Sequence, residues 1–248
     1  MIKAVLFDFG DTIFTFGKVD TIAMFKEGAR LTYDYLKSAG VKLPSFRRYL
    51  YVNLACIYLR VAYSALSGKD FDSLKLIRFV NERLGLRLSN DRWQKIAWLW
   101  YEPLSKTAVL EPDIRQTLAK LRDMGLQLGI VSNTFLNQRS LDHHLEQFGL
   151  LEFFPLRVYS CETLWRKPHI RIFRVAAGLL RLPPENIAFV GDRLDTDIRG
   201  SINAGMIPIL KSAHSNEGKP LPPSVQKINS LADLPSLIEK LNASPLKA

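Results

Sequence analysis

Cysteine and histidine are scarce in this 248-residue chain, which has only 2 cysteines and 4 histidines. The cysteines, Cys56 and Cys161, lie far apart and form no Cys-x-x-Cys pair, so neither a disulfide framework nor a thiolate metal site is expected. The apolar run before Asp8 is too short for a secretory signal, and we expect no segment of membrane-spanning length. These absences predict a cytoplasmic protein without membrane contacts.

The chain also lacks a concentrated basic tail, although its formal net charge is +10. A positive net charge attracts anions. Because the lysines and arginines are spread along the whole sequence, we do not expect a nucleic-acid partner. The apolar content of 47% is enough for a well-buried core. A globular protein that binds an anionic ligand is therefore expected.

Strand-like and helix-like segments alternate from Pro112 onward, which is typical of a parallel sheet with helical crossovers. The strands are expected at 4–7, 127–131, 157–160, 187–190 and 206–210. The helices are expected at 112–124, 137–148, 168–180, 195–204 and 234–241, with a loop at 212–224. The pattern predicts an α/β fold in which a doubly wound, Rossmann-like parallel sheet forms the core.

Residues 17–101 differ in composition, because they show helical periodicity and no short strand-like runs. We expect an all-helical insert here, and we call residues 17–101 the helical insert. Its helices are expected at 20–39, 46–66, 70–84 and 90–100. The core domain then comprises residues 1–16 and 102–248. Most aromatic residues of the insert are interpreted as helix-packing residues.

Polar residues follow the predicted strands where each strand ends. Asp8 follows the first strand, Ser132 the second, and Asp192 the apolar strand at 187–190, while Lys167 precedes a helix. Because the carboxyl ends of parallel strands meet in one crevice, we expect these side chains to lie together. Their joint occurrence is more informative than any one of them.

The order of these motifs resembles that of the haloacid dehalogenase-like hydrolase superfamily, in the subgroup with a helical C1-type cap between the first and second motifs. The resemblance covers nearly the whole chain. It rests on Phe-Asp-Phe-Gly-Asp-Thr at 7–12, Val-Ser-Asn-Thr at 131–134, Lys-Pro at 167–168, and Gly-Asp-Arg-Leu-Asp-Thr-Asp at 191–197. It implies the same α/β core, and the helical insert would be the cap.

The resemblance also implies roles for individual residues. Asp8 would attack phosphorus to form an aspartyl-phosphate, which water then cleaves. Lys167 and Ser132 would be catalytic, and both would bind the substrate together with Thr12 and Asn133. A phosphate dianion repels a carboxylate, so such a site must supply positive charge and fixed hydrogen-bond donors. The expected substrate is a small, anionic phosphorylated compound.

Mg²⁺ is the cofactor that the resemblance implies. Its ligands would be Asp8, the carbonyl group of Gly10, and Asp192, because hard divalent cations prefer oxygen ligands. Asp197 lies farther along the same segment. It is expected to orient Lys167 or a metal-bound water rather than to bind the ion directly.

Each motif also fits a structural role when it is taken alone. Ser132 to Thr134 could cap the following helix. Asp192, Asp195 and Asp197 suit the beginning of a helix on dipole grounds, and for Asp195 we keep that interpretation. Arg193 is equally compatible with a substrate contact and with a surface salt bridge.

Gly10 departs from the pattern of the family's phosphatases, which carry a second aspartate two residues after the nucleophile as a general acid. Losing a positioned proton donor costs about 10²–10⁴ in rate. Asp11 is one residue farther along, where a tight turn redirects the side chain, so whether Asp11 or a residue of the insert replaces the acid stays open.

Three functions are compatible with this departure. The first is a Mg²⁺-dependent phosphohydrolase with weakened acid catalysis. The second is a non-catalytic protein that binds a partner, or a second copy of itself, through the helical insert, which a large exposed aromatic patch would favour. The third is a 2-haloacid dehalogenase-like hydrolase, against which Asp192 counts, because substitution at carbon needs no cation there.

Overall fold

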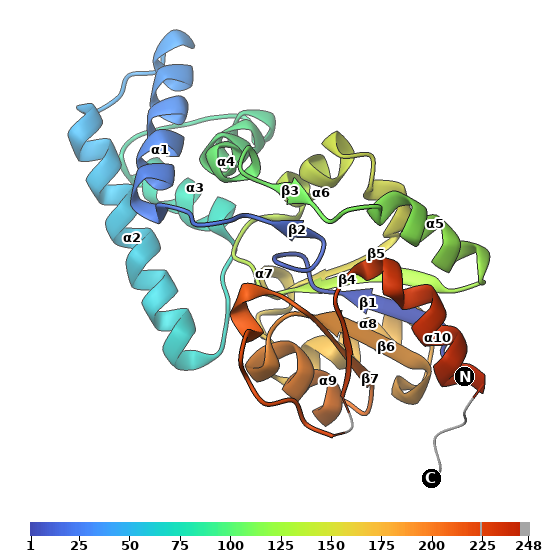
Figure 1. Ribbon diagram of the computed structural model, residues 1–248. Helices are drawn as coiled ribbons and strands as arrows, with labels where there is room; N and C mark the ends of the chain where they lie inside the picture. The colour runs from blue at the N-terminus through green and yellow to red at the C-terminus, as the bar shows by residue number, and fades with distance from the viewer. Residues whose placement is uncertain (224, 244–248) are drawn as a thin grey trace.

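A computed structural model describes residues 1–223 and 225–243, and the end of the predicted core, 244–248, lies outside them (Figure 1). In the described residues, parallel strands form a 6-stranded sheet in the order β5-β4-β1-β6-β7-β8. Their bounds are β1 Ala4–Phe7, β4 Gln127–Ser132, β5 Leu156–Tyr159, β6 Ile187–Gly191, β7 Ile207–Lys211 and β8 Gln226–Ile228. The predicted α/β fold class is confirmed.

Helices cover both faces of the sheet, so the central strands β1 and β6 are buried on two sides. On one face lie α5 (Ile114–Asp123), α6 (Gln138–Gln147) and α10 (Leu234–Ala243); on the other lie α8 (Ile170–Leu180) and α9 (Arg199–Asn203), as Figure 1 shows. Val5 and Phe7 of β1 pack in the first layer, whereas Ala4 and Leu6 pack in the second. This double burial explains why the strand is apolar throughout.

The register of the sheet brings three strand ends to the same level. Phe7 at the end of β1 pairs with Ile130 of β4 on one side and with Val190 of β6 on the other. Asp8 and Asp192 come directly after β1 and β6, and Ser132 is the last residue of β4. The polar residues that follow the strands therefore meet at one edge of the sheet.

Four helices make up the helical insert: α1 Thr21–Ser38, α2 Phe46–Ser67, α3 Ser73–Arg83 and α4 Asn90–Ser105. The side chains of Asp20, Ser45 and Asp72 cap the first three helices at their N-termini. The helices enclose an apolar core of their own, which includes Leu36, Ile57 and the helix-packing residue Trp93. Helix α4 continues to Ser105 rather than ending near 100. The domain boundaries at 16 and 102 stay a prediction.

Helix α2 corrects the expectation that no segment reaches membrane-spanning length. The helix has 22 residues, and an 18-residue window within it has a mean hydropathy of 1.2, so by length and composition it is long and apolar enough to cross a membrane. Only 22% of that apolar window is buried in the structure, because the insert packs against one side of the helix. Tyr58, Leu59 and Leu66 are 44%, 71% and 90% exposed. Apolar side chains thus occur on both sides of α2.

Several short elements of the structure were not expected from the sequence. Strand β8, the two-residue strands β2 (Phe14–Thr15) and β3 (Val109–Leu110), and the one-turn helix α7 (Ser160–Thr163) were not predicted. These elements are too short to show a repeating pattern of apolar and polar residues. The helix expected at 195–204 is instead a π-helical turn at Leu194–Ile198 followed by α9. The loop expected at 212–224 contains a 3₁₀ turn at His214–Asn216, and its last residue lies outside the described residues.

Candidate active site

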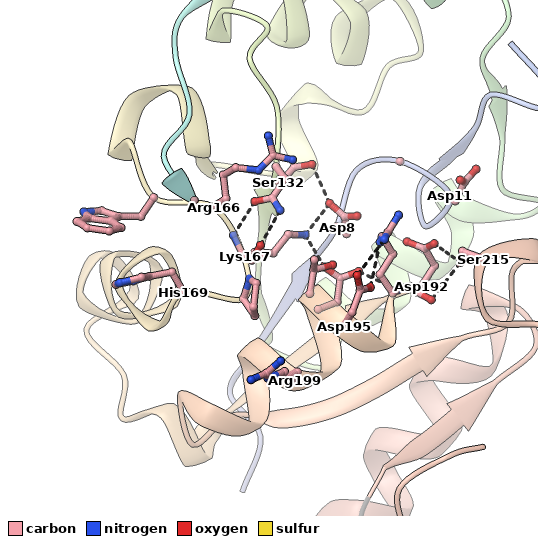
Figure 2. Close-up of a pocket in the computed structure, with 18 of the residues that line it drawn as sticks. Asp8, Asp11, Ser132, Arg166, Lys167, His169, Asp192, Asp195, Arg199 and Ser215 are labelled. Atoms are coloured by element: carbon pink, nitrogen blue, oxygen red, sulfur yellow. Dashed lines mark hydrogen bonds and ion pairs between the residues drawn. The ribbon is translucent and has the colours of Figure 1, made fainter. Parts of the chain in front are cut away.

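Lys167 lies at the centre of the site and joins two carboxylates (Figure 2). Its Nζ atom is 2.8 Å from Oδ1 of Asp8 and 2.7 Å from Oδ1 of Asp197, and its side chain is only 1% exposed. Burial alone would lower the pKa of Lys167, but the carboxylates of Asp197 and Asp8 outweigh it, and the pKa is raised. The ammonium group is therefore a fixed positive charge beside Asp8.

Ser132 and Lys167 hold the same oxygen of Asp8. The Oγ atom of Ser132 donates a hydrogen bond of 2.7 Å to Oδ1, the oxygen that Lys167 also contacts. These two contacts fix the orientation of the carboxylate, as Figure 2 shows. The structure thus brings the three expected catalytic residues together.

Asn133 holds the backbone of Lys167 from both sides. Its side-chain oxygen accepts a hydrogen bond from the Lys167 backbone N–H at 2.7 Å, and its side-chain nitrogen donates to the Lys167 carbonyl at 2.9 Å. The amide group expected to bind substrate is thus engaged in positioning Lys167. Its role toward a substrate stays a prediction.

Thr12 is not brought to the cavity. It is 1% exposed and is absent from the cavity wall, whereas Gly10 and Asp11 before it line that wall. The chain turns at Asp11, whose φ of 52° lies in the left-handed region, and the direction of the side chains changes there. The structure therefore gives no support for the expected contact between Thr12 and a substrate.

Asp192 and Asp197 complete a cluster of carboxylates. One oxygen each from Asp8, Asp192 and Asp197 lies within 4.8 Å of the others, and all three residues are buried. The pKa of Asp192 is raised to about 7, because burial, together with the carboxylates of Asp8 and Asp197, outweighs a hydrogen bond from Ser215 that lowers it. Burial also raises the pKa of Asp197, although Lys167 opposes the shift.

This cluster carries more negative charge than Lys167 alone can balance. Three carboxylates with closely spaced oxygens are a donor set that suits a hard divalent cation such as Mg²⁺. Both oxygens of Asp197 have protein partners, because Oδ1 contacts Lys167 and Oδ2 accepts a hydrogen bond from the backbone N–H of Arg193 at 3.1 Å. Asp8 and Asp192 are thus the carboxylates better placed to bind a cation.

The π-helical turn after β6 explains how Asp197 reaches Lys167. A Cβ atom at Gly191 would lie 2.4 to 2.6 Å from the side chain of Asp197, which leaves no room for a larger residue. Glycine at this position therefore permits the aspartate to fold back over the end of β6. Asp197 was expected near Lys167 from the sequence, but this close approach to Gly191 was not.

Ser215 and Asn216 are site residues that the sequence analysis missed. Ser215 donates a short hydrogen bond to Oδ2 of Asp192, and the side-chain nitrogen of Asn216 donates to the Asp192 carbonyl at 2.8 Å. Both lie in the segment that was predicted to be a loop. The segment has no periodic pattern of apolar residues, so nothing in its composition indicated that these residues fold back onto Asp192.

The site opens into a cavity of about 960 Å³ between the sheet and the helical insert. Ser64 in the last turn of α2 and Gly68, the residue after the helix, form part of its wall together with Asp8 and Lys167. Further cavity residues are Trp165, Arg166, His169, Arg193, Arg199 and His214. The cavity thus has a charged floor and a wall supplied by the insert.

Arg193 pairs with Asp195 on the wall of the cavity. Its guanidinium donates two hydrogen bonds to the carboxylate, at 3.2 and 3.0 Å, and both side chains are more than half exposed. The salt bridge that was one of two interpretations of Arg193 is therefore present. Exposed pairs of this kind add little to stability.

The chain is similar to several known proteins in sequence and in fold. Residues 2–205 match a family model described as haloacid dehalogenase-like hydrolase. A glyceraldehyde 3-phosphate phosphatase of Methanopyrus kandleri is 33% identical over 84% of this chain and 83% of its own length. A phosphatase structure from Thermococcus onnurineus has a TM-score of 0.61 at 24% identity, covering 96% of this chain and 98% of its own.

A 2-haloacid dehalogenase from Pseudomonas syringae is also similar in structure. Its TM-score is 0.60 at 21% identity, and the match covers 97% of this chain and 99% of the dehalogenase. At this level of identity the two structures share a fold, and the likeness does not distinguish the reactions. The identity of the reaction has to come from the site residues.

Proposed function

This chain belongs to the haloacid dehalogenase-like hydrolase family, and on that premise we propose that it is a Mg²⁺-dependent phosphohydrolase that acts on a small phosphorylated compound. The resemblance stated from the motifs is thereby confirmed at the level of the family. The name of the Methanopyrus kandleri relative, a phosphatase of a three-carbon sugar phosphate, supports a small phosphorylated substrate. The cytoplasmic location stays a prediction.

One observation carries the proposal: Asp8 is held by Ser132 and Lys167 through a single oxygen. Asp8 attacks phosphorus, so that a bond forms between its oxygen and phosphorus while the bond to the ester oxygen breaks. Water then attacks the aspartyl-phosphate and releases inorganic phosphate and the free carboxylate. Lys167 balances the negative charge of the phosphoryl oxygens in both steps.

Asp8, Asp192 and the carbonyl group of Gly10 would hold the Mg²⁺ ion. When bound, the ion supplies positive charge that reduces the repulsion between a phosphate dianion and Asp8. Asp197 positions Lys167 through the ion pair of 2.7 Å and is proposed as a neighbour of the ion rather than a ligand. This arrangement leaves one positive side chain and one cation among three buried carboxylates.

Gly10 leaves the site without the second aspartate that donates a proton to the leaving group in related phosphatases. Leaving groups that depart as stable anions, such as those of acyl, enol or aryl phosphates, depend little on that proton. Asp11 lines the cavity but points away from Asp8 in Figure 2. We therefore propose that the preferred substrates have good leaving groups.

A phosphatase assay tests this function directly. It compares an activated aryl phosphate with a panel that includes glyceraldehyde 3-phosphate, in Mg²⁺ and in excess chelator, for the native protein and Asp8→Asn. We expect the native protein with Mg²⁺ to release phosphate fastest from the aryl ester, and Asp8→Asn to lose at least about 10³-fold in kcat. Undiminished turnover by Asp8→Asn would contradict the mechanism, and chloride release from a 2-chloroacid would favour the dehalogenase instead.

Contact with a second copy through the helical insert is a further candidate function. Tyr51, Tyr58, Leu59, Tyr63 and Leu66 are exposed along one stretch of α2, and such patches mark interaction surfaces. Two α2 helices packed against each other would cover this set in both copies. Sedimentation of the native protein and Leu59→Glu tests it: a dimer that the substitution dissociates supports the contact, and a native monomer at high concentration excludes it.

A further inference from the structure

Asp70 is a buried carboxylate that lies outside the cavity, in the segment between α2 and α3. Its side chain is 0% exposed, and it is not among the residues that line the cavity wall. Burying a charge is unfavourable unless the charge is paired and hydrogen-bonded. The contacts of Asp70 therefore indicate why an aspartate stands at this position.

Asp70 has partners in both the helical insert and the core. Its Oδ1 atom accepts hydrogen bonds from the Phe71 backbone N–H at 3.1 Å and from Ser64 Oγ at 3.3 Å. Its Oδ2 atom accepts a hydrogen bond of 2.7 Å from Ser160 Oγ and lies 3.5 Å from Nη1 of Arg166. Ser160 and Arg166 belong to the core, so this carboxylate joins the two parts of the molecule.

The contact with Ser160 leads to the loop that carries Ser132. The hydroxyl oxygen of Ser160 accepts a hydrogen bond of 2.8 Å from the backbone N–H of Thr134. Thr134 is two residues beyond Ser132, which holds Asp8. The position of this loop is therefore tied to Asp70 through one hydroxyl group.

The contact with Arg166 leads to Lys167, the next residue in the chain. Here the backbones of insert and core also pair, because Asp70 N–H donates to the Leu164 carbonyl at 2.9 Å and Arg166 N–H donates to the Gly68 carbonyl at 3.2 Å. Arg166 also donates a side-chain hydrogen bond of 2.9 Å to Ser64. The insert thus fixes the residue directly before Lys167.

Asn133 connects the two branches, because it accepts a hydrogen bond of 2.7 Å from the backbone N–H of Lys167. We propose that Asp70 is a positioning residue, which couples docking of the helical insert to the placement of Ser132 and Lys167 around Asp8. The proposal rests on the phosphohydrolase function for its catalytic consequence. Its structural part, the coupling between Asp70 and the two loops, is measurable without turnover.

The test compares Asp70→Asn with a matched control, Asp72→Asn, in the same segment. Asp72 caps α3, accepting hydrogen bonds from the backbone N–H groups of Leu74 and Lys75 at 2.8 and 3.2 Å, and the amide oxygen of asparagine can replace it. We expect Asp70→Asn to lower kcat by about 10 to 100-fold with little change in KM, because small displacements of catalytic groups are costly. Asp72→Asn should leave kcat within about twofold.

Arg166→Gln gives a second readout if Asp70→Asn folds poorly, and where both single variants fold, the double variant tests whether the two residues act together. Arg166 is 35% exposed, so its replacement disturbs less packing. Residues of one network are not additive, and the double variant should be no slower than the slower single variant. Losses in kcat that multiply would show independent roles and overturn the proposal.

Amide hydrogen exchange provides the readout that does not need a substrate. In Asp70→Asn, exchange at the N–H groups of Thr134 and Lys167 should accelerate at least tenfold, while the amides of β1 stay protected. Unchanged exchange at both positions, or equal acceleration throughout the chain, would overturn the proposal. If the native protein hydrolyses no ester, the proposed function fails, and the exchange experiment alone decides whether the coupling exists.

Discussion

At the residue scale, the proposed chemistry depends on how Asp8 is held and on the glycine at position 10, where related phosphatases have a second aspartate. Ser132 and Lys167 fix Asp8 through its Oδ1 atom, so the carboxylate that we propose as the nucleophile is already oriented. At Gly10, an added Cβ atom would meet nothing closer than a ring carbon of Phe16 at 3.8 Å, and the residue is not in the left-handed region. The backbone therefore has room for a side chain, and glycine is not required there by packing.

Gly10→Asp is expected to restore a general acid. It should raise kcat for alkyl phosphates by about 10² or more, and should change turnover of the activated aryl phosphate much less, because that leaving group needs no proton. Steady-state kinetics on both ester types measure the effect, with Gly10→Asn as the control that fills the same space without an acidic proton. Equal gains for both esters, or a gain with the asparagine variant, would contradict the account of Gly10.

At the element scale, helix α6 places His144 inside the core rather than on the surface. His144 is 0% exposed, its ring stacks on Phe14 at 4.6 Å, and its Nδ1 atom lies 2.5 Å from the hydroxyl group of Tyr101 in α4. Burial lowers the pKa of His144 to about 4, with a smaller contribution from His143. The neutral imidazole thus belongs to the packing between α4, α6 and the β2 segment.

This burial predicts acid lability. The folded pKa lies below the unfolded value of 6.5, so the unfolded state binds more protons between pH 6.5 and pH 4, and stability falls as the pH decreases through that window. His144 should contribute a loss on the order of 3 kcal/mol by pH 4. Urea unfolding of the native protein and His144→Gln at pH 7 and pH 4.5 measures it. An identical pH dependence for both proteins would contradict the prediction.

The long elements were predictable from the sequence because their apolar periods repeat, as in the strand at 187–190 and the helix at 168–180. Asp8, Ser132, Lys167 and Asp192 were predictable as a group because strand ends converge. Thr12 was not, because one left-handed residue, Asp11, turned the chain away from the cavity.

Asp70 and Ser215 were not predictable for a different reason. Asp70 begins the helix expected at 70–84, and Ser215 lies in the loop expected at 212–224, but both reach the site only through tertiary contacts with Ser160, Arg166 and Asp192. Local composition does not report such contacts. Pairings between distant loops therefore needed the structure.

At the scale of the whole molecule, the sheet, the insert and the loop after β7 each contribute to one site. The sheet brings Asp8, Ser132 and Asp192 to one edge, and the insert closes the cavity above them with the end of α2. The positive net charge favours the approach of an anion, and in the proposed mechanism a bound cation offsets the charge of the buried carboxylates when a phosphate dianion approaches Asp8. In this account, the net charge of the whole chain acts on the approach of the substrate, and the cation acts on the charge balance inside the site.

The covalent intermediate on Asp8 is the central claim, and mass spectrometry of the acid-quenched protein tests it most directly. The native protein mixed with Mg²⁺ and an aryl phosphate should gain the mass of one phosphoryl group, located on the peptide that contains Asp8, and Asp8→Asn should gain none. Steady release of phosphate by the native protein without any modified Asp8 peptide, or the same modification in Asp8→Asn, would contradict the mechanism.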